Sequence, residues 1–285
     1  MLLYIHHGGQ LCNRLFAITP ALTYAIHHGQ KLHVFYADEK YMSLFPNLRE
    51  CKNLCIHKNN NYYFHGFLDR LYNRKYFRIE EKLKRKKPFF LPSFINGWDH
   101  VEDVSFVEQY KDTIKRVFDV SDGVKKKIQE VLCPFEGITI GVHVRRGDYK
   151  DWWHGKYYYD DSVYLRIMKN LQEELYNKGE KCRFLICSNE PFNASVEGLN
   201  ILRIPEAEAI EDLYGLSQCD YIVGPPSTFS QWAAFVGGKS LFFMMRPSDN
   251  PRIEDFSRIR RYRHFENGNR VIYNDALIQF EIVKK

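Results

Sequence analysis

The sequence predicts an α/β protein made of two Rossmann-like halves, each a mostly parallel sheet with helices on both faces. From residue 137 onward, short apolar runs alternate with stretches of helical spacing, which is typical of such a sheet. At the N-terminus, an apolar run, a glycine turn, an amphipathic stretch and a second apolar run form the pattern of a βαβ unit. The chain has 285 residues, enough for two domains. We expect the boundary near Cys133–Pro134, with domains at 1–134 and 135–285.

The N-terminal half begins with the apolar run 2–5, which predicts a strand. The stretch 11–28 has helical spacing and contains Pro20, so we expect a helix that is interrupted there. The next apolar run, 32–36, predicts the second strand. These three elements define the first βαβ unit.

The C-terminal half contains five apolar runs that predict strands, at residues 138–144, 184–187, 201–204, 221–223 and 241–245. Three stretches between them predict helices, at residues 160–176, 211–218 and 227–236. Open sheets of this kind bind their ligands beyond the carboxyl ends of the strands. The residues that carry chemistry are therefore expected where these runs end.

The composition is that of a soluble globular chain, because 45% of the residues are hydrophobic and 27% are charged. That share of hydrophobic residues excludes disorder as the default. The net charge of +6 fits anionic ligands but does not by itself indicate nucleic acid. The sequence shows no signal peptide and no long apolar run, and its seven cysteines are scattered. We expect a cytoplasmic protein, either free or peripheral at the inner face of the membrane.

A basic run at residues 70–87 contains nine Lys and Arg and only two acids. A solvated helix explains such a run. An anionic membrane surface or an acidic glycan acceptor are the alternatives.

The first candidate site is the segment HVRRGDY at residues 143–149, directly after the predicted strand 138–144. Strand alternation places His143 and Arg145 on one face. Arg145 and Arg146 offer bidentate donors that suit phosphate oxygens. Asp148 can orient an arginine or accept a proton. A surface ion-pair cluster is the alternative interpretation.

The second candidate site opens the predicted helix 227–236. Ser227 or Thr228 can cap this helix, and the free N–H groups and hydroxyls at such a terminus bind anions. Ser230 lies in the first turn and can face the same anion. Capping alone also explains Ser227 and Thr228.

Two weaker signals follow other strands. Gly8 and Gly9 allow a ligand to approach the turn after the first strand, although packing explains them equally well. Ser188 and Asn189 follow the strand 184–187, where polar side chains can reach a base or ribose or can simply leave the sheet. The sequence contains no P-loop, no GxSxG elbow, and no HExxH or DxD motif, and adjacent histidine pairs cannot share one metal. We expect no metal.

Together these motifs resemble the α-1,2-fucosyltransferases of glycosyltransferase family 11 and, more widely, the α-1,2/α-1,6/protein O-fucosyltransferase superfamily. The pattern His-x-Arg-Arg-x-Asp-Tyr is matched by His143, Arg145, Arg146, Asp148 and Tyr149. The pattern Gly-Gly-x-x-x-Asn is similar to Gly8, Gly9 and Asn13, and the late motif is similar to residues 228–234. The helix before that motif is similar to Asp212-Leu213-Tyr214. One departure is Gln231, which stands where the late motif of the family has a tryptophan.

The resemblance implies a GT-B-like fold, with two facing Rossmann-like domains and the active site in the cleft between them. It implies that the N-terminal domain lies on the acceptor side and that the C-terminal domain binds the GDP-sugar. It implies transfer of fucose from GDP-fucose to a galactoside hydroxyl of a glycan with terminal galactose, α-1,2-linked, with inversion and without a metal. Arginines can neutralise the charge on the leaving phosphate, and inversion needs a base. The catalytic candidates are Arg146, Asp148 and His143. The donor-binding candidates are Gly9, Asn13, His143, Arg145, Arg146, Ser188, Asn189, Ser227, Thr228, Phe229 and Ser230.

Three alternatives stay open at this point. One is transfer of another sugar, or of fucose through another linkage. Another is a catalytically inactive, lectin-like sugar binder. The third is a nucleic-acid-binding protein, suggested by the basic run 70–87 and the cluster 258–263. No nucleic-acid-binding fold accompanies those clusters and +6 is low for that role, so we expect no nucleic acid.

Overall fold

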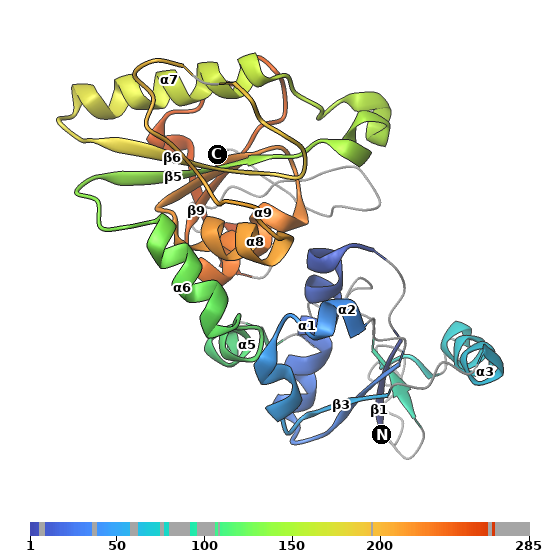
Figure 1. Ribbon diagram of the computed structural model, residues 1–285. Helices are drawn as coiled ribbons and strands as arrows, with labels where there is room; N and C mark the ends of the chain where they lie inside the picture. Colours follow the sequence, from blue (N-terminus) through green and yellow to red (C-terminus); the bar gives the residue numbers. More distant parts are fainter. Residues whose placement is uncertain are drawn as a thin grey trace. The chain divides into compact units, whose positions relative to one another are not determined.

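The computed structural model describes residues 1–5, 9–35, 39–57, 62–74, 77–79, 92–95, 106–107, 109–194, 196–261 and 264–265. The chain forms two compact units, Met1–Ser121 and Asp122–Lys285 (Figure 1). The division between them precedes helix α6 (Asp122–Val131), whereas the sequence prediction placed the boundary after that helix. Helix α6 belongs to the second unit because it packs on helix α8 (Ala209–Gln218). The roles predicted for the two domains stay predictions.

The first unit contains a parallel sheet in the order β3-β2-β1-β4. Its strands are β1 (Leu2–Ile5), β2 (Leu32–Phe35), β3 (Leu54–Ile56) and β4 (Ser93–Phe94). Its described helices are α1 (Leu11–His27), α2 (Glu39–Met42), the 3-10 helix η1 (Pro46–Glu50), α3 (Tyr62–Asn73) and α5 (Lys111–Val117). The predicted βαβ unit is confirmed as β1, α1 and β2.

Helix α1 runs without interruption through Pro20, so the predicted break at that proline is wrong. Proline cannot donate to the carbonyl of Phe16, which costs the helix one hydrogen bond. The hydroxyl of Thr19 donates to the carbonyl oxygen of Leu15 at 2.6 Å, and that of Thr23 donates to the carbonyl oxygen of Pro20 at 2.9 Å. Burial of nearly the whole helix outweighs the lost bond.

The second unit contains a sheet in the order β11-β10-β9-β8-β5-β6-β7. Five strands are parallel: β5 (Ile138–Val144), β6 (Cys182–Ser188), β7 (Ile201–Arg203), β8 (Tyr221–Gly224) and β9 (Ser240–Phe243). Two antiparallel strands, β10 (Ser257–Arg261) and β11 (His264–Phe265), extend one edge. The remaining described elements are α6, η4 (Gly147–Lys150), η5 (Trp152–Gly155), α7 (Asp161–Asn177), α8, α9 (Thr228–Gly237) and η6 (Ile253–Asp255). The mostly parallel sheet and the predicted strands and helices of this half are confirmed, with ends that shift by at most two residues.

Helices cover both faces of this sheet, with α7 on one side and α8 and α9 on the other (Figure 1). Ile140, Val142 and Val144 of β5 pack in the core beneath α7. The alternate residues of β5 face the other side, where a Cβ on Gly141 would lie 2.7 Å from Leu216 of α8. Strand alternation therefore places His143 on the α8 and α9 side of the sheet.

The chain reverses direction across the sheet between β5 and β8. After β5 it adds β6 and β7 on one side, and it then returns to add β8 and β9 on the other. Open α/β sheets bind ligands at such a switch point, beyond the carboxyl ends of the strands. The carboxyl ends of β5, β6 and β8 lie side by side, because Val144 pairs with Ser188 and Val142 pairs with Val223.

The end of β8 lies directly against the end of β5. A Cβ on Gly224 would lie 2.7 Å from the carbonyl oxygen of His143 and 2.8 Å from its Cβ. Only glycine fits this approach without a shift of the backbone. Gly224 therefore brings the loop after β8 close to the loop after β5.

Across the described segments, no helix combines the length and the apolar composition that a bilayer span requires.

Candidate functional site

Arg145 and Arg146 leave β5 at the switch point of the second unit. The guanidinium of Arg145 forms an ion pair with Asp148, with 2.7 Å between Nη2 and Oδ1, and it lies 5.4 Å from the centre of the Tyr149 ring. The side chain of Arg145 is 15% exposed and that of Asp148 is 53% exposed. The first predicted role of Asp148, orienting an arginine, matches this geometry.

Arg146 is held by two segments that the sequence does not place near it. Its Nη2 forms an ion pair with Asp161, the first residue of α7, and its Nη1 donates to the carbonyl oxygen of Pro191 at 3.2 Å. The Phe192 ring centre lies 5.7 Å from the guanidinium carbon. Among the described residues, the buried Nε atom of Arg146 has no hydrogen-bond partner. These contacts with the start of α7 and with the segment 191–192 orient the Arg146 guanidinium.

Gly147 and Asn189 join the loop after β5 to the loop after β6. Gly147 has φ +59°, and a Cβ there would lie 3.0 Å from Nδ2 of Asn189. The Oδ1 atom of Asn189 accepts a hydrogen bond of 2.8 Å from the backbone N–H of Arg146. The predicted ligand-binding residue Asn189 thus also fixes the backbone that carries the arginines. Ser188 donates to the carbonyl oxygen of Glu190 at 2.6 Å and closes the adjacent turn.

The N-terminus of α9 lies in the loop after β8. Ser227 is the N-cap, and its Oγ accepts a hydrogen bond of 3.2 Å from the backbone N–H of Phe229. Thr228 and Phe229 are half-buried. Ser230 is fully buried, and its hydroxyl donates to the carbonyl oxygen of Ser227 at 3.2 Å. Ser227 and Ser230 therefore stabilise the turn that presents the terminal N–H groups.

Tyr149 ties the loop after β5 to the loop after β8. Its hydroxyl donates to the carbonyl oxygen of Pro226. Burial raises the pKa of Tyr149 to about 12, so the phenol stays protonated at neutral pH. The loop of residues 145–149 after β5, here called the arginine loop, is thereby held against the start of α9.

His143 is buried between β5 and α9. The side chain is 4% exposed, and its ring lies 5.1 Å from the Phe229 ring in a stacked arrangement. Burial, and next the charge of Arg145, lowers the pKa of His143 to about 3. The buried Nδ1 atom has no hydrogen-bond partner within the described part of the chain. His143 is neutral at physiological pH, where it is a weak proton acceptor.

Asp212 lies near the start of α8 and carries the most perturbed carboxyl group described at this site. Burial raises its pKa from 3.8 to about 7. The thiol of Cys187, the residue paired with His143 across β5 and β6, donates to the backbone carbonyl of Asp212 at 3.6 Å. A carboxyl group that titrates near neutrality beside a ligand site is a candidate acid or base. The sequence showed Asp212 only as part of a motif, because its burial depends on tertiary packing.

Gln231 is a second residue that the sequence analysis did not select. Its side chain is fully buried on α9, and neither Oε1 nor Nε2 has a hydrogen-bond partner among the described residues. Leaving a buried amide unpaired is costly, which is typical of a group that a ligand or a water satisfies. In the sequence, the only indication of a special role for Gln231 was that the family motif has a tryptophan at this position.

Gly9 and Asn13 lie at the start of α1 in the first unit. Gly9 has φ +90°, and a Cβ there would lie 3.1 Å from Cβ of Asn13. The backbone carbonyl of Gly9 accepts a hydrogen bond of 2.7 Å from Nε of Arg14. The two predicted residues are therefore neighbours, whereas Gly8 lies outside the described residues.

The structure gathers most of the predicted site at one edge of one sheet. Loops after β5, β6 and β8 bring together two arginines, a carboxylate, an amide and a helix N-terminus. Arginine forks and helix N–H groups are the donors that proteins use for phosphate oxygens. Fold and site thus have the features of a nucleotide-binding α/β protein.

The chain belongs to glycosyl transferase family 11, whose family model matches residues 67–260. The chain is 28% identical over 185 residues to galactoside alpha-(1,2)-fucosyltransferase 1 of Homo sapiens, covering 58% of this chain and 48% of that protein. It is also 28% identical over 159 residues to the enzyme of the same name from Gorilla gorilla gorilla, covering 49% of this chain and 42% of that protein. The chain spans about half the length of the curated relatives it matches.

Solved structures of fucosyltransferases share the fold. The NodZ alpha-1,6-fucosyltransferase, soaked with GDP-fucose, aligns with a TM-score of 0.51 and 14% identity, covering 88% of this chain and 99% of that chain. POFUT1 in complex with GDP-fucose aligns with a TM-score of 0.52 and 10% identity, covering 88% of this chain and 96% of that chain. The predicted GT-B-like α/β class is confirmed by these neighbours and by the two sheets of mainly parallel strands.

Proposed function

We propose that this family 11 glycosyltransferase transfers fucose from GDP-fucose to a galactoside hydroxyl, with an α-1,2 linkage, inversion and no catalytic metal. The observation that carries the proposal is the convergence of Arg145, Arg146 and the α9 N-terminus at the switch point of the sheet. The names of the relatives support the donor, the acceptor and the linkage.

The donor pyrophosphate fits between the arginine loop and the start of α9. Loss of GDP places charge on its β-phosphate, and paired guanidinium groups stabilise that charge where other enzymes use a divalent cation. The backbone N–H groups at the start of α9 add donors from the other side. We assign Asn189 and Phe229 to the edges of this site, since Asn189 orients the Arg146 backbone and Phe229 stacks on His143.

Transfer with inversion takes one displacement step. The acceptor oxygen bonds to C1 of fucose as the bond from C1 to the phosphate oxygen breaks, and the hydroxyl proton passes to a base. We assign Asp148 as that base, because its carboxylate is oriented by Arg145 and is 53% exposed, so an acceptor can reach it. His143, with a pKa of about 3, is better suited to contact the ligand as a neutral group. Asp212 is the alternative base.

A glycan with terminal galactose is the acceptor in this proposal. We assign the acceptor side to the first unit, together with Gly9 and Asn13 at the start of α1. The basic run 70–87, most of which lies outside the described residues, is proposed as a surface for an acidic acceptor or for anionic lipid. A cytoplasmic location, with peripheral contact at the inner face of the membrane, completes the proposal.

A transfer assay tests the proposal. The chain is incubated with GDP-fucose and a panel of β-galactosides, with GDP-mannose and UDP-galactose as control donors. We expect a fucosylated product from GDP-fucose alone, and NMR of the product gives both the linkage and the anomeric configuration. Transfer from a control donor would overturn the proposed donor. Retention of configuration would overturn the inverting mechanism, and linkage to a position other than O2 would overturn the α-1,2 assignment.

A thermal shift experiment separates the enzyme from the nucleic-acid-binding alternative. GDP stabilises a GDP-sugar enzyme by mass action, whereas RNA stabilises an RNA-binding protein. We expect the melting temperature to rise with GDP and to stay constant with RNA. A lectin-like binder would bind GDP-fucose or the galactoside and show no turnover.

A further inference from the structure

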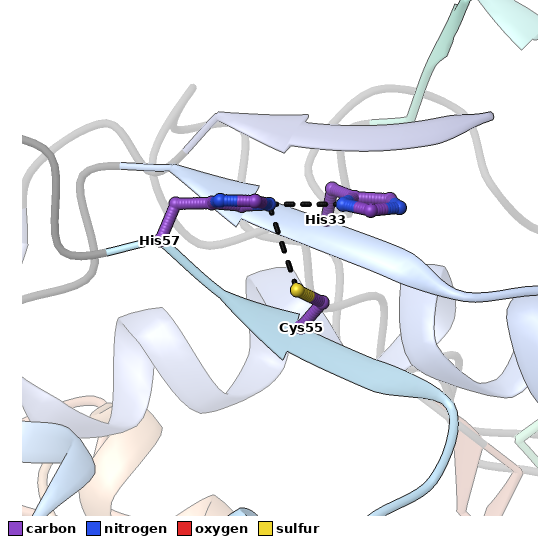
Figure 2. A group of neighbouring side chains, drawn as sticks. All are labelled: His33, Cys55 and His57. Carbon is purple, nitrogen blue, oxygen red and sulfur yellow. Dashed lines mark hydrogen bonds between the residues drawn. The ribbon is translucent and has the colours of Figure 1, made fainter.

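Three potential metal ligands meet on one face of the sheet in the first unit. His33 lies in β2, Cys55 lies in β3, and His57 directly follows β3. Figure 2 shows the imidazole of His57 directed at both His33 and Cys55. The distance is 2.9 Å from Nδ1 of His33 to Nε2 of His57, and 3.6 Å from Sγ of Cys55 to the same Nε2. All three ligand atoms lie within 4.8 Å of one another.

Strand pairing brings these side chains together. His33 pairs directly with Cys55 across the parallel ladder, and the backbone N–H of His57 continues that ladder by donating to the carbonyl oxygen of Val34 at 2.9 Å. Cys55 and His57 are two residues apart, so their side chains lie on the same face. The ring of Phe35 stacks on the ring of His57, with centroids 4.4 Å apart and an interplanar angle of 4°. Packing therefore fixes the orientation of the His57 imidazole.

We propose that His33, Cys55 and His57 form a zinc-binding site that clamps β3 to β2. Two imidazoles and one thiolate are a ligand set that Zn²⁺ prefers, with water or another ligand in the fourth position. Zn–N bonds of about 2.0–2.1 Å and a Zn–S bond of about 2.3 Å give tetrahedral N···S and N···N distances of about 3.5 Å and about 3.4 Å. The distance from Cys55 to His57 already matches the first value.

Small side-chain movements complete the coordination shell. The two imidazole nitrogens must separate by about 0.5 Å from their present hydrogen-bonded distance to reach the tetrahedral value. All three side chains are half-buried, so an ion can still reach them. Cys55, like the other six cysteines, forms no disulfide and is available as a thiolate ligand.

Burial, and next the neighbouring His57, lowers the pKa of His33. Zinc binds imidazole through a ring nitrogen that carries no proton, and it binds cysteine as the thiolate, so metal binding at this site releases the thiol proton of Cys55.

A metal at this site runs against the expectation of no metal drawn from the sequence. The ligands are separated along the chain and match no spacing motif. They also lie in the first unit, whereas the proposed phosphate site lies in the second. A metal here stabilises the pairing of the three-residue strand β3, which lies at the edge of the described sheet. Turnover does not need this metal, and the proposed function stands or falls independently of it.

Cobalt binding tests the site in the full-length chain, prepared without an affinity tag and stripped with a chelator. Titration with CoCl₂ alone is followed by absorption spectroscopy. We expect one equivalent to produce a thiolate-to-cobalt charge-transfer band and the visible bands of tetrahedral Co²⁺, and ZnCl₂ to displace both.

Single variants identify the ligands. Cys55→Ser should remove the charge-transfer band, and His33→Ala and His57→Ala should each weaken cobalt affinity by at least about tenfold. Cys51→Ser and His27→Ala serve as matched controls, since they change a nearby half-buried cysteine and an exposed histidine of the same unit. Both controls should bind like wild type. A spectrum without a thiolate band, or one that Cys55→Ser leaves unchanged, would overturn the proposal.

X-ray absorption on the zinc-loaded wild-type chain identifies the atoms that bind zinc, and it does so even if a variant does not fold. We expect a first shell that contains one sulfur and nitrogen atoms. A shell of oxygen and nitrogen alone, or of several sulfurs, contradicts this site. Zinc should also raise the melting temperature of the wild type by mass action, and an unchanged value at saturating zinc argues against the clamp.

Discussion

Replacing Arg146 separates its proposed catalytic role from its structural one. If the guanidinium stabilises charge on the departing phosphate, Arg146→Ala loses one transition-state contact worth about 3–4 kcal/mol, a rate loss of about 10²–10³. The same change removes the ion pair with Asp161 and the hydrogen bond to the Pro191 carbonyl. Asp161 is 31% exposed and can be rehydrated, so the stability cost is about 1–3 kcal/mol.

Arg146→Lys refines the test. Lysine can keep the ion pair with Asp161 but lacks the planar fork that binds two phosphate oxygens. We therefore expect Arg146→Lys to melt closer to wild type than Arg146→Ala does, yet to remain impaired in turnover. The measurements are initial rates with GDP-fucose and a β-galactoside, GDP affinity by calorimetry, and thermal melting.

Arg183→Lys is the matched control. Arg183 is buried and Arg146 is half-buried, but Arg183 lies at the opposite end of the strands, where it donates to the Thr139 hydroxyl at 3.0 Å and to the Leu132 carbonyl at 3.2 Å. Thr139 is about 16 Å from Val144 at the rise of a parallel strand. This variant should lose stability while GDP affinity and turnover stay normal. Near-normal turnover in folded Arg146→Ala or Arg146→Lys would refute the phosphate assignment.

Three further predictions concern pH, chelation and the basic run. Asp212 loses its proton at about pH 4 in the unfolded chain but only at about pH 7 in the folded chain, where burial raises its pKa, so its contribution to stability is fully present below pH 4 and falls by up to about 4 kcal/mol in total as the pH rises from about 4 through about 7. Asp212→Asn should flatten that part of the stability–pH profile in urea melts, and an unchanged slope contradicts the assignment. EDTA should leave the initial transfer rate unchanged at temperatures below melting, and an activity that returns only with Mn²⁺ or Mg²⁺ contradicts metal-independent transfer. Neutralising Lys84, Arg85, Lys86 and Lys87 together should weaken binding to anionic vesicles or to an acidic acceptor, most strongly at low salt, and should leave GDP affinity unchanged. A fall in GDP affinity alone would place the run in the donor site.

The sequence predicts the second unit well because its signals are local. The run 138–144 is apolar and β-branched, so it indicates a buried strand without knowledge of its neighbours. The parallel arrangement then follows from alternation with helices, and it places Arg145, Asn189 and Ser227 at one edge of a sheet. Each of those positions depends only on where a strand ends.

What the sequence misses depends on tertiary packing. The ion pair between Arg146 and Asp161 needs the orientation of α7 on the sheet, and the raised pKa of Asp212 needs the burial of one particular side of α8. The cluster of His33 with Cys55 and His57 needs the register in which strand β2 pairs with strand β3. No local sequence pattern predicts this ion pair, this raised pKa or this cluster of three side chains.

Pro20 shows the opposite error, in which a local rule is too strong. Proline at the centre of a helix predicts a break, because a hydrogen bond is lost. Burial of helix α1 against its sheet supplies more stabilisation than that bond, so the helix continues. Local rules fail where packing contributes a larger free energy than propensity.

The switch point also has a consequence for folding kinetics. Its three loops come from segments around residues 145, 189 and 227, and each parallel pairing between them closes a long loop of chain. Contacts of such high sequence separation form late, so the proposed phosphate site has no partly assembled precursor in a short stretch of the chain. During refolding, GDP binding should therefore appear together with the last cooperative phase, and secondary structure should form before it.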